Sequence, residues 1–376
     1  MGSALTLRRV KSDIEVLARA GLDTSTFLAE ADASLQRAVP HVAACIPILD
    51  PATNLLTGTY KFGDLFGRDD HDDEWGTIEF GGSDPTSFAE LLRREQPAVG
   101  VHLATNGDVA CSDRLRDLII PHYGYADEAR LLACEGARAW GAMALFRGAE
   151  EGPFAAEEVA FLATLSDALA AGMRAGLLAR AGRTPSASLS GPAVLIVGAD
   201  GQYRQLSVGA EEALAELGSE EHSAAASGTI AALVAGARRY AAGSTTVLPR
   251  CRVRVGSGRW LVLHASPLAS LDGTSGDVVV TVEEARPPEI VPLVVAAFEL
   301  TPRERDVTQM VLQGVETKEI AATLHMSPYT VQDHLKSVFE KAAVRSRREL
   351  IARVFFDQYV PRMGSELAPS GWFAEP

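Results

Sequence analysis

The sequence predicts an α+β protein whose last segment is all-α. Residues 12–180 mix apolar positions at helical spacing with short runs of β-forming residues, and residues 190–285 show a second mixture of this kind after a break. Residues 298–360 contain four short helical patterns instead. At 376 residues the chain is too long for one ordinary core, and a rule of about 100–200 residues per domain favours several domains. We therefore expect three folded regions.

The composition is that of a soluble globular protein, with 47% hydrophobic and 22% charged residues. No apolar run approaches the roughly 18 residues that span a bilayer, and the N-terminus lacks a secretory signal pattern. The sequence therefore predicts a cytoplasmic protein with no membrane partner. The four cysteines are widely spaced and form no C-x-x-C pair, which argues against a zinc knuckle and a disulfide framework.

The charge is unevenly distributed along the chain. Its net value is −14, yet residues 298–362 carry ten Lys/Arg against nine Asp/Glu, a balance of +1, while residues 1–297 carry 25 against 38, a balance of −13. Contact with nucleic-acid phosphates needs clustered Lys and Arg. The charge therefore excludes a protein that coats nucleic acid over its whole surface.

The first region reads as helices and strands in alternation. We expect two helices within residues 12–39, broken near Gly21–Thr24, and further helices at residues 87–94, 114–123 and 154–180. Short strands are expected at residues 41–50, 55–62, 99–104, 129–134 and 140–146. Asp50–Asn54 has the composition of a turn that joins two paired strands.

The second region follows a linker at residues 181–191, which is recognised by its composition. A helical zone is expected at residues 210–242. Strands are expected at residues 191–197, 203–207, 246–255, 259–267 and 277–283. The last three strands predict an antiparallel meander, and Arg286–Pro288 marks the next break.

Both regions resemble known sensor folds. The run Ala129–Cys134, followed by Gly141–Phe146, Phe154 and the closing helix, resembles a GAF domain, which we place at residues 1–180 with its flanking helices. Residues 190–285 are similar to a PAS domain in strand order and in the Asp200-Gly201 turn. These resemblances imply a small-molecule ligand held between a sheet and its helices, but they name no ligand-binding residue and no cofactor.

The third region has a start signal for each helix. Thr301-Pro302-Arg303-Glu304 is a capping box, and Gly314 ends the first helix. Thr317 caps the second helix, Ser327-Pro328 opens the third, and Ser346-Arg347-Arg348-Glu349 opens the last. Short helices joined by such tight turns predict a helix-turn-helix.

The third helix of this region has two distinct faces. Its inward face is predicted to contain Val331, Leu335, Val338, Phe339 and Ala342. Its outward face is predicted to contain Tyr329, Gln332, Asp333, Lys336 and Glu340. A helix with an exposed row of long polar side chains can lie in the major groove of DNA and contact base edges.

The same region resembles the LuxR/FixJ-type helix-turn-helix domain over about 60 residues. The matching positions are Leu300, Thr301, Pro302, Arg303, Glu304, Gly314, Lys318, Glu319, Ile320, Ala321, Leu324, Ser327, Thr330, Val331, His334, Lys341, Val344, Arg345, Arg348, Glu349 and Leu350. The resemblance implies an all-α four-helix domain at residues 298–360 that binds double-stranded DNA, with a flexible tail at residues 361–376.

The resemblance also assigns roles to individual residues. It implies base contacts by Gln332, Asp333 and Lys336, and phosphate contacts by Lys318, Thr330 and Lys341. The final helix would form the dimer contact. Two positions depart from the family pattern. Ala343 replaces the usual Gly, which predicts strain of about 1 kcal/mol at a left-handed position, and Asp333 places a negative charge on a surface that faces phosphates.

Other candidate sites have simpler explanations. Two interpretations are open for His102, His122 and His264, which are either metal or haem ligands or hydrogen-bonded structural residues. None of them has a second histidine four residues away on a helix. The acidic run Asp69–Glu74 is either a cation site or a solvated loop. Its carboxylates lack the spacing of a calcium-binding loop, which argues against the cation site. Trp75, Trp140 and Trp260 line a pocket or pack in the core. We favour the structural interpretations, predict no metal site and no catalytic residue, and expect a protein that is not an enzyme.

These observations together predict a homodimeric, sequence-specific DNA-binding transcription regulator. A signal sensed in the GAF-like and PAS-like domains would control its DNA binding, with coupling through the helix that ends near Arg180 and through residues 289–298. The alternative is a protein-interaction adaptor that has a DNA-binding domain but no small-molecule ligand, and that recruits a kinase or RNA polymerase.

Overall fold

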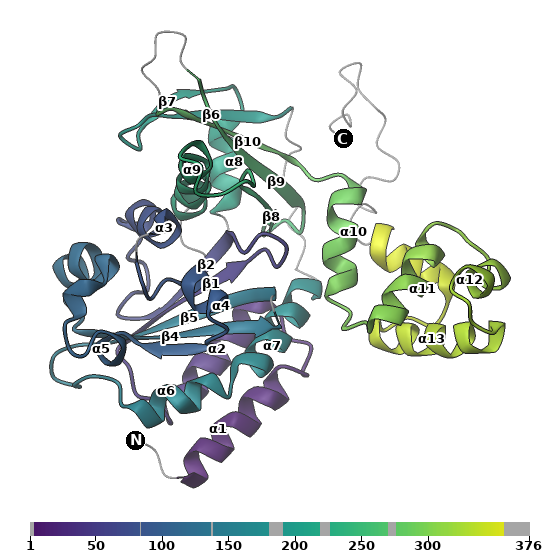
Figure 1. Cartoon of the computed structure of the whole chain (residues 1–376), viewed down its shortest axis with the longest axis horizontal. Coiled ribbons are helices and arrows are strands. Elements are labelled where there is room, and N and C mark those ends of the chain that lie inside the picture. Colours follow the sequence, from purple (N-terminus) through teal and green to yellow (C-terminus); the bar gives the residue numbers. More distant parts are fainter. Residues whose placement is uncertain are drawn as a thin grey trace. The chain divides into compact units, whose positions relative to one another are not determined.

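The computed structural model describes residues 4–82, 84–136, 138–179, 191–218, 226–269 and 276–356. The chain divides into two compact units, Met1–Glu284 and Ala285–Pro376. The first unit contains two five-stranded sheets, and the second is helical within its described residues (Figure 1). The predicted tail at residues 361–376 and all of the predicted linker except Gly191 lie outside the described residues.

The first sheet is antiparallel throughout its described pairs. It consists of β1 (Ala43–Leu49), β2 (Leu56–Gly63), β3 (Ala98–Gly100), β4 (Asp127–Glu135) and β5 (Arg138–Arg147), in the order β2-β1-β5-β4-β3. Asp50–Asn54 joins β1 to β2, as predicted. The strand predicted at residues 99–104 is wrong beyond Gly100, because the chain turns there into the short helix α5 (Val101–Ala104).

Helices at both ends of the first region pack together on one face of this sheet (Figure 1). They are α1 (Ala4–Leu17), α2 (Thr24–Leu35), α6 (Ala156–Ala163) and α7 (Ser166–Leu178). The single helix predicted for residues 154–180 is wrong, because α6 and α7 meet at a bend of 46°. At the bend, the amides of Thr164 and Leu165 bond to carbonyls three residues back, and the Thr164 hydroxyl also donates to Phe161 O, which tightens the last turn of α6.

Within the described residues, no individual helix has the length and apolar composition needed to cross a membrane. The bent pair α6 and α7 meets those criteria only when the two helices are taken together.

The opposite face of the first sheet is covered by α3 (Asp72–Gly81), α4 (Phe88–Arg93), the short turn η1 (Val109–Cys111) and the π-helical segment η2 (Leu115–Tyr123). Their apolar side chains and those of the sheet form one core. Its fully buried members include Leu65, Val101, Leu115, Leu118, Ile119 and Phe146.

The second sheet repeats the strand order of the first. It consists of β6 (Ala193–Val197), β7 (Tyr203–Leu206), β8 (Arg250–Arg254), β9 (Trp260–Pro267) and β10 (Val278–Glu284), in the order β7-β6-β10-β9-β8. The predicted meander of its last three strands is confirmed. The predicted helical zone contains α8 (Ala210–Leu217) and α9 (Ala226–Ala241), with residues 219–225 outside the described chain.

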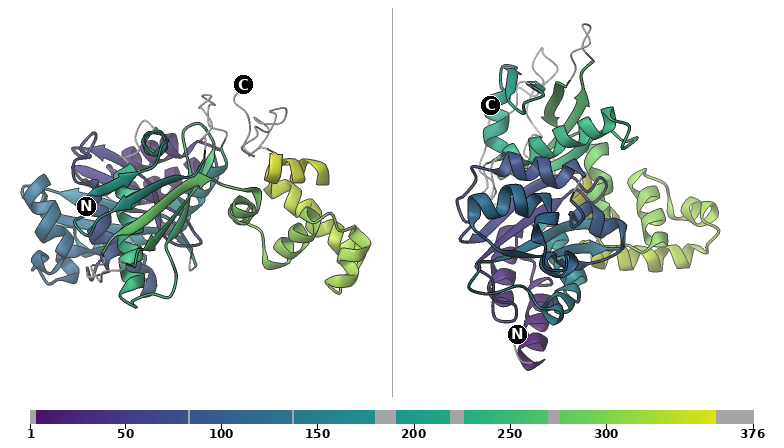
Figure 2. Two further views of the ribbon diagram at one scale, coloured as in Figure 1. Left: turned by 90° about the horizontal axis from the view of Figure 1, so that it is seen from above. Right: turned by 60° about the vertical axis from the view of Figure 1, so that its left-hand side comes forward.

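The helix α9 packs both on the second sheet and on α3 of the first region (Figure 2). The two helices meet at glycines, because a Cβ atom on Gly76 would lie 2.5 Å from the carbonyl oxygen of Gly228. A buried ion pair joins the regions again: Arg252 of β8 donates through Nε to Asp50 Oδ2 at 2.8 Å and through its amide to the same oxygen at 3.0 Å. The two sheet regions therefore form one packed unit.

The second unit begins with α10 (Pro287–Ala296), where the sequence had predicted only a break. The four expected helices follow as α11 (Pro302–Leu312), α12 (Thr317–Thr323), α13 (Pro328–Lys341) and α14 (Arg347–Ile351), and α14 continues into η3 (Ala352–Phe356). The predicted inward face of α13 is confirmed, with Phe339 half-buried and the other four residues buried. The fold class is confirmed, since an α+β region is followed by an all-α region.

Candidate DNA-binding surface and sensor cavity

The helix-turn-helix is built from α12 and α13. Ser327 begins α13, and its hydroxyl oxygen accepts a hydrogen bond from the amide of Thr330 at 3.0 Å. The preceding turn places His325 in the left-handed region, with φ of 54°, and the amide of Met326 closes it by donating to the carbonyl of Ala321 at 2.9 Å. Buried Ile320 and Ala321 of α12, together with the inward face of α13, fix the relative position of the two helices.

The outward face of α13 is exposed. Tyr329 is 75% exposed, and the base-contact candidates Gln332, Asp333 and Lys336 are all exposed on the same helix. The Gln332 side chain lies 3.5 Å from the hydroxyl of Thr317, the first residue of α12. The structure therefore brings these three side chains to one face, and their contacts with bases stay predictions.

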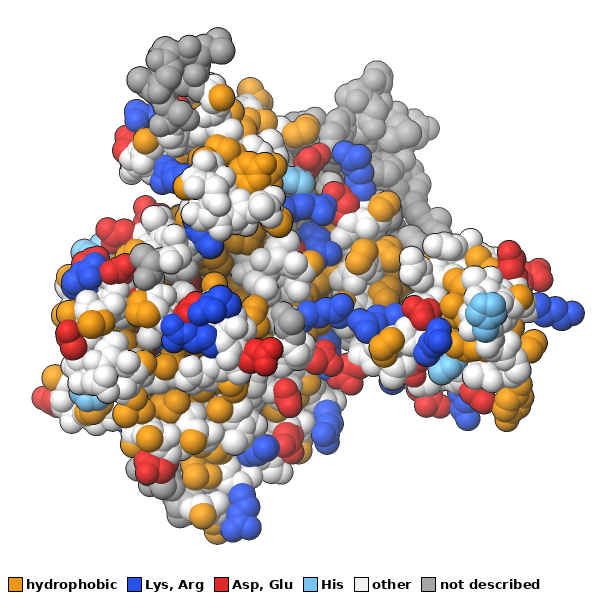
Figure 3. Space-filling view, viewed as in Figure 1, with side chains coloured by type: hydrophobic (Ala, Val, Ile, Leu, Met, Phe, Trp, Pro, Cys, Tyr) orange, Lys and Arg blue, Asp and Glu red, His pale blue; other side chains and the backbone are white. Residues whose placement is uncertain are grey.

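The phosphate-contact candidates have different surroundings. Lys318 is exposed in the first turn of α12, and Thr330 is exposed in the first turn of α13, where its hydroxyl lies 2.9 Å from that of Ser327. Positive, negative and histidine side chains are interspersed on the visible face of the helical unit (Figure 3). No single-sign patch is visible on the helical unit in that view, and the roles of these residues stay predictions.

Lys341 belongs to a polar cluster around the buried carboxylate of Glu304. Its ammonium group donates to Glu304 Oε2 at 2.6 Å and to the carbonyl of Glu299 at 3.2 Å. Ser337 donates to the other carboxylate oxygen at 2.7 Å. Burial would raise the pKa of Glu304, but the hydrogen bonds from Lys341 and Ser337 outweigh it and lower the pKa to about 2. The capping box at Thr301 is thereby tied to the end of α13, and a phosphate contact by Lys341 would compete with this ion pair.

Ala343 adopts the backbone conformation predicted from its replacement of Gly. Its φ is 52°, in the left-handed region, and the amide of Val344 donates to the carbonyl of Phe339 at 2.9 Å. This arrangement ends α13 and turns the chain toward α14.

Comparison with known proteins agrees with this geometry. Residues 299–354 match the family described as bacterial regulatory proteins, luxR family. Residues 299–354 are a LuxR-type domain. The LuxR-type domain is 48% identical over 52 residues to a putative HTH-type transcriptional regulator of Mycobacterium tuberculosis, and 46% identical over 56 residues to the transcriptional regulatory protein UhpA of Escherichia coli. The predicted resemblance to a LuxR-type domain is therefore confirmed, and the matched proteins are named as transcriptional regulators.

These relatives match only the LuxR-type domain. The match to the mycobacterial protein covers 14% of this chain and 6% of the relative, and the match to UhpA covers 15% and 29%. Among solved structures, similar chains include the GAF domain from a phosphoenolpyruvate-protein phosphotransferase of Coxiella burnetii, with 17% identity, a TM-score of 0.31 and coverage of 46% of this chain and 95% of that one. The VqmA dimer of Vibrio cholerae follows with 16% identity, a TM-score of 0.21 and coverage of 45% and 84%.

The first unit contains a cavity of about 270 Å³ between the first sheet and the helices α3, α4 and α9. Trp75, Phe80 and Phe88 contribute aromatic walls, and Thr59 and Thr229 add hydroxyl groups. Of the three tryptophans considered from the sequence, only Trp75 lines this cavity, whereas Trp140 and Trp260 are buried core residues. The cavity has the mainly apolar lining of small-molecule sites.

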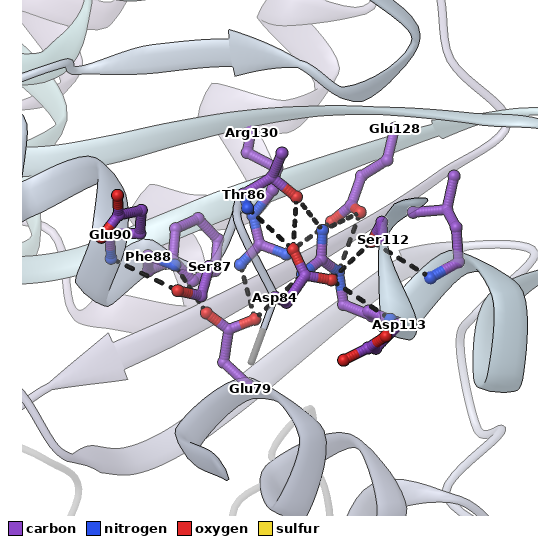
Figure 4. A network of polar contacts seen from close by, with 12 residues as sticks. Glu79, Asp84, Thr86, Ser87, Phe88, Glu90, Ser112, Asp113, Glu128 and Arg130 are labelled. Carbon is purple, nitrogen blue, oxygen red and sulfur yellow. Dashed lines mark hydrogen bonds and ion pairs between the residues drawn. The ribbon is translucent and has the colours of Figure 1, made fainter. Parts of the chain in front are cut away.

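A buried charge network adjoins the cavity and was missed from the sequence (Figure 4). Arg114 donates to Glu128 Oε2 at 2.7 and 2.9 Å, and Arg130 donates to Glu79 Oε2 at 2.7 Å and to Glu128 Oε1 at 3.1 Å. Asp84 is paired with Arg114 at 3.2 Å. Burial opposes ionisation of Asp84, but Arg114 holds the pKa of that carboxyl well below its usual range.

The network connects the cavity wall to the sheet. Glu79 lies on α3 and lines the cavity, and its other carboxylate oxygen accepts from the amide of Phe88, a second lining residue, at 2.7 Å. The Arg130 guanidinium lies 3.7 Å from the centre of the Phe88 ring. Residues this far apart along the chain carry no spacing signal, so only the folded structure shows that they belong together.

The acidic run at residues 69–74 is not simply a solvated loop, which corrects the favoured interpretation. Asp72 is 5% exposed and begins α3, and the buried Lys61 ammonium donates to Asp72 Oδ1 at 2.5 Å and to Asp69 Oδ1 at 2.8 Å. Burial raises the pKa of Asp72 to about 6, against the attraction of Lys61. The run therefore fastens α3 to β2.

Proposed function

We propose that this chain is a sequence-specific DNA-binding transcription regulator whose DNA binding is controlled by a signal sensed in its N-terminal unit. The observation that carries the DNA-binding part is the exposed polar face of α13 on a buried LuxR-type core. A helix of this kind enters the major groove, where side chains such as Gln332 and Lys336 can distinguish base pairs. Lys318 and Thr330 would hold the helix in register through phosphates.

The regulator would act as a homodimer. Two LuxR-type domains bind together when their α13 helices match half-sites about 34–36 Å apart. The last helix, α14, would form the contact between the two copies. A signal then needs only to change the relative arrangement of the two domains in order to change affinity for DNA.

The cavity supports the sensor role over the adaptor alternative. Its aromatic and hydroxyl-bearing lining suits a small apolar molecule with one or two polar groups. The helix α3 lines the cavity through Trp75 and Glu79 and also packs on α9 at Gly76 and Gly228. A ligand that displaced α3 would therefore displace α9 of the second sheet region, whose last strand, β10, precedes α10 in the chain.

DNA binding by the full-length protein tests the first part of the proposal. DNA sites would be selected from a random duplex pool and then titrated in a fluorescence-anisotropy experiment over a salt series. We expect the selected site to bind at least ~10³-fold more tightly than a scrambled duplex. Equal affinity for both duplexes at every salt concentration would reject sequence-specific binding.

Thermal denaturation tests the sensor part. A small-molecule library would be screened for compounds that raise the melting temperature of the full-length protein. The Leu92→Trp variant narrows the cavity at a half-buried wall position, so it should lose the response to a genuine cavity ligand. Stabilisation that persists in this variant would place the ligand elsewhere, and a library without hits would favour the adaptor alternative.

A further inference from the structure

Three side chains with metal-ligating atoms converge on the surface of the first unit. His71 Nδ1 lies 3.2 Å from Glu74 Oε2, and His122 Nε2 lies 3.8 Å from the same carboxylate oxygen. One ligand atom from each residue lies within 4.8 Å of the other two. The three residues come from two segments that are about 50 positions apart in the sequence, so the fold alone brings them together.

Each residue is placed by a defined backbone feature. His71 directly precedes α3, and Glu74 lies in the first turn of that helix. His122 lies in the last turn of η2, which Gly124 ends in the left-handed conformation. Arg68 donates to the carbonyl of His122 at 2.9 Å, which holds the end of η2 near the start of α3. The two imidazole rings are consequently close, with centroids 3.7 Å apart.

The donor set fits a borderline transition-metal ion better than a hard cation. Two imidazole nitrogens and one carboxylate oxygen are ligands that Zn²⁺ accepts at about 2.0–2.2 Å, with a fourth position left for water. Ca²⁺ and Mg²⁺ prefer sets made of oxygens. The side chains of His71, Glu74 and His122 are 33%, 53% and 36% exposed, so an ion can reach them and they can turn inward to close the distances.

The charges around the cluster also favour a cation. Asp69, Asp70 and Asp73 lie in the same short run of sequence, and the positive charge of Lys61 is already paired with Asp69 and Asp72. The opposing charges are the Arg68 guanidinium beside the cluster and the positive end of the α3 dipole. Glu74 and its acidic neighbours in the first turn of α3 offset that dipole.

We propose that His71, Glu74 and His122 form a site for a divalent transition metal of the Zn²⁺ class. The bound ion would clamp η2 to the start of α3, which is the helix that lines the sensor cavity and packs on α9. The site goes beyond the proposed DNA-binding function and does not depend on it, since all three ligands belong to the first unit.

Isothermal titration of Zn²⁺ into the chelator-stripped, thiol-reduced full-length protein tests this site. We expect one high-affinity equivalent per chain at pH 7.5. The His71→Ala and His122→Ala variants should each weaken it by more than the ~10–100-fold that loss of an outer-shell partner causes. His102→Gln and Cys111→Ser serve as matched controls that remove a histidine and an exposed thiol elsewhere, and they should leave the affinity unchanged.

Two further arms separate the site from unspecific binding. Mg²⁺ should give no comparable equivalent. Glu74→Gln, which keeps the helix start and removes the anionic ligand, should also weaken binding and covers the case in which a histidine variant fails to fold. Unchanged Zn²⁺ affinity in these three variants, or no high-affinity equivalent in the native protein, would overturn the proposal.

Discussion

The two units of this protein use their polar residues in opposite ways. In the helical unit, the candidate functional side chains are exposed and lie within two consecutive helices, α12 and α13. In the sheet-containing unit, the most connected polar residues are buried and pair across long stretches of chain, as Glu79 does with Arg130 and Asp50 with Arg252. In the helical unit, the candidate binding surface is therefore formed by residues that are close together in the sequence. In the sheet-containing unit, the structure around the cavity is held by ion pairs between residues that are far apart in the sequence.

The difference also has an energetic side. Burying a charge costs several kcal/mol, which is recovered only when its partners are complete, so loss of one member strands the others. An exposed side chain stays hydrated and can be replaced at little cost to folding. Substitutions in the first unit should therefore act mainly on stability, and those on the outward face of α13 mainly on DNA binding.

The largest expected effect is that of Arg114→Met in the buried network. Arg114 faces three carboxylates, those of Glu79, Asp84 and Glu128, and its loss leaves Arg130 as the cation that pairs with Glu79 and Glu128. We expect the free energy of unfolding of the first unit to fall by about 3–5 kcal/mol. Urea denaturation followed by tryptophan fluorescence measures it.

Arg116→Met is the matched control for this substitution. Its side chain is 47% exposed and pairs with Asp113 and Asp117 in solvent, so its loss should lower the free energy of unfolding far less than the loss of Arg114 does. Equal losses in the two variants would remove the distinction between buried and exposed charges on which the comparison rests.

A smaller effect is expected for Glu304→Gln, the buried carboxylate of the helical unit. Gln keeps only one acceptor oxygen and carries no charge, so it loses the ion pair with Lys341 and cannot accept all the hydrogen bonds that Glu304 accepts from Lys341, Ser337 and the Thr301 amide. We expect a loss of about 1.5–3 kcal/mol in the stability of α11 and α13. Hydrogen exchange of the amides in these helices measures it locally, and Glu340→Gln, at an exposed position, should leave exchange unchanged.

The lowered pKa of Glu304 predicts a pH dependence for the same helices. Folding lowers this pKa from 4.5 to about 2, so the stabilisation is complete above pH 4.5 and declines as the pH falls toward 2. The decline should be absent in Glu304→Gln. The same acid dependence in the variant would mean that another group causes it.

The smallest effect is a gain. Ala343→Gly removes a side chain from a left-handed position and should stabilise the helical unit by about 1 kcal/mol. Ala342→Gly is the control one residue earlier, where the backbone is right-handed and the methyl group is buried, and it should destabilise. We expect amide hydrogen exchange in the helical unit to become slower in Ala343→Gly and faster in Ala342→Gly. If exchange changed in the same direction in both variants, backbone strain at residue 343 would be excluded.

The sequence predicted those features that depend on neighbouring residues. The capping box at Thr301, the left-handed Ala343 and the inward face of α13 follow from local chemistry, and the paired strands β1 and β2 follow from the turn between them. The bend between α6 and α7 was not predicted, because apolar spacing continues across it while the backbone hydrogen bonds change at Thr164.

The sequence could not predict features that require distant segments to meet. The cavity, the Arg114 network and the approach of His122 to His71 each combine residues from separate elements, and no spacing rule connects them. The charge of Asp72 suggested solvent exposure, and only Lys61, supplied by β2, makes its burial tolerable. The exposure of Asp72 was therefore misjudged because its partner, Lys61, lies on another element.

The central claim, that α13 reads DNA sequence while α12 holds the backbone, is tested by measuring affinities for single-base-pair variants of a selected site. Lys336→Ala in the full-length protein should lose about 1–3 kcal/mol of discrimination at one base pair and little at the others. Lys318→Ala should weaken binding to every variant alike and reduce the salt slope by about 1. A uniform loss in Lys336→Ala, or no loss at all, would contradict the account.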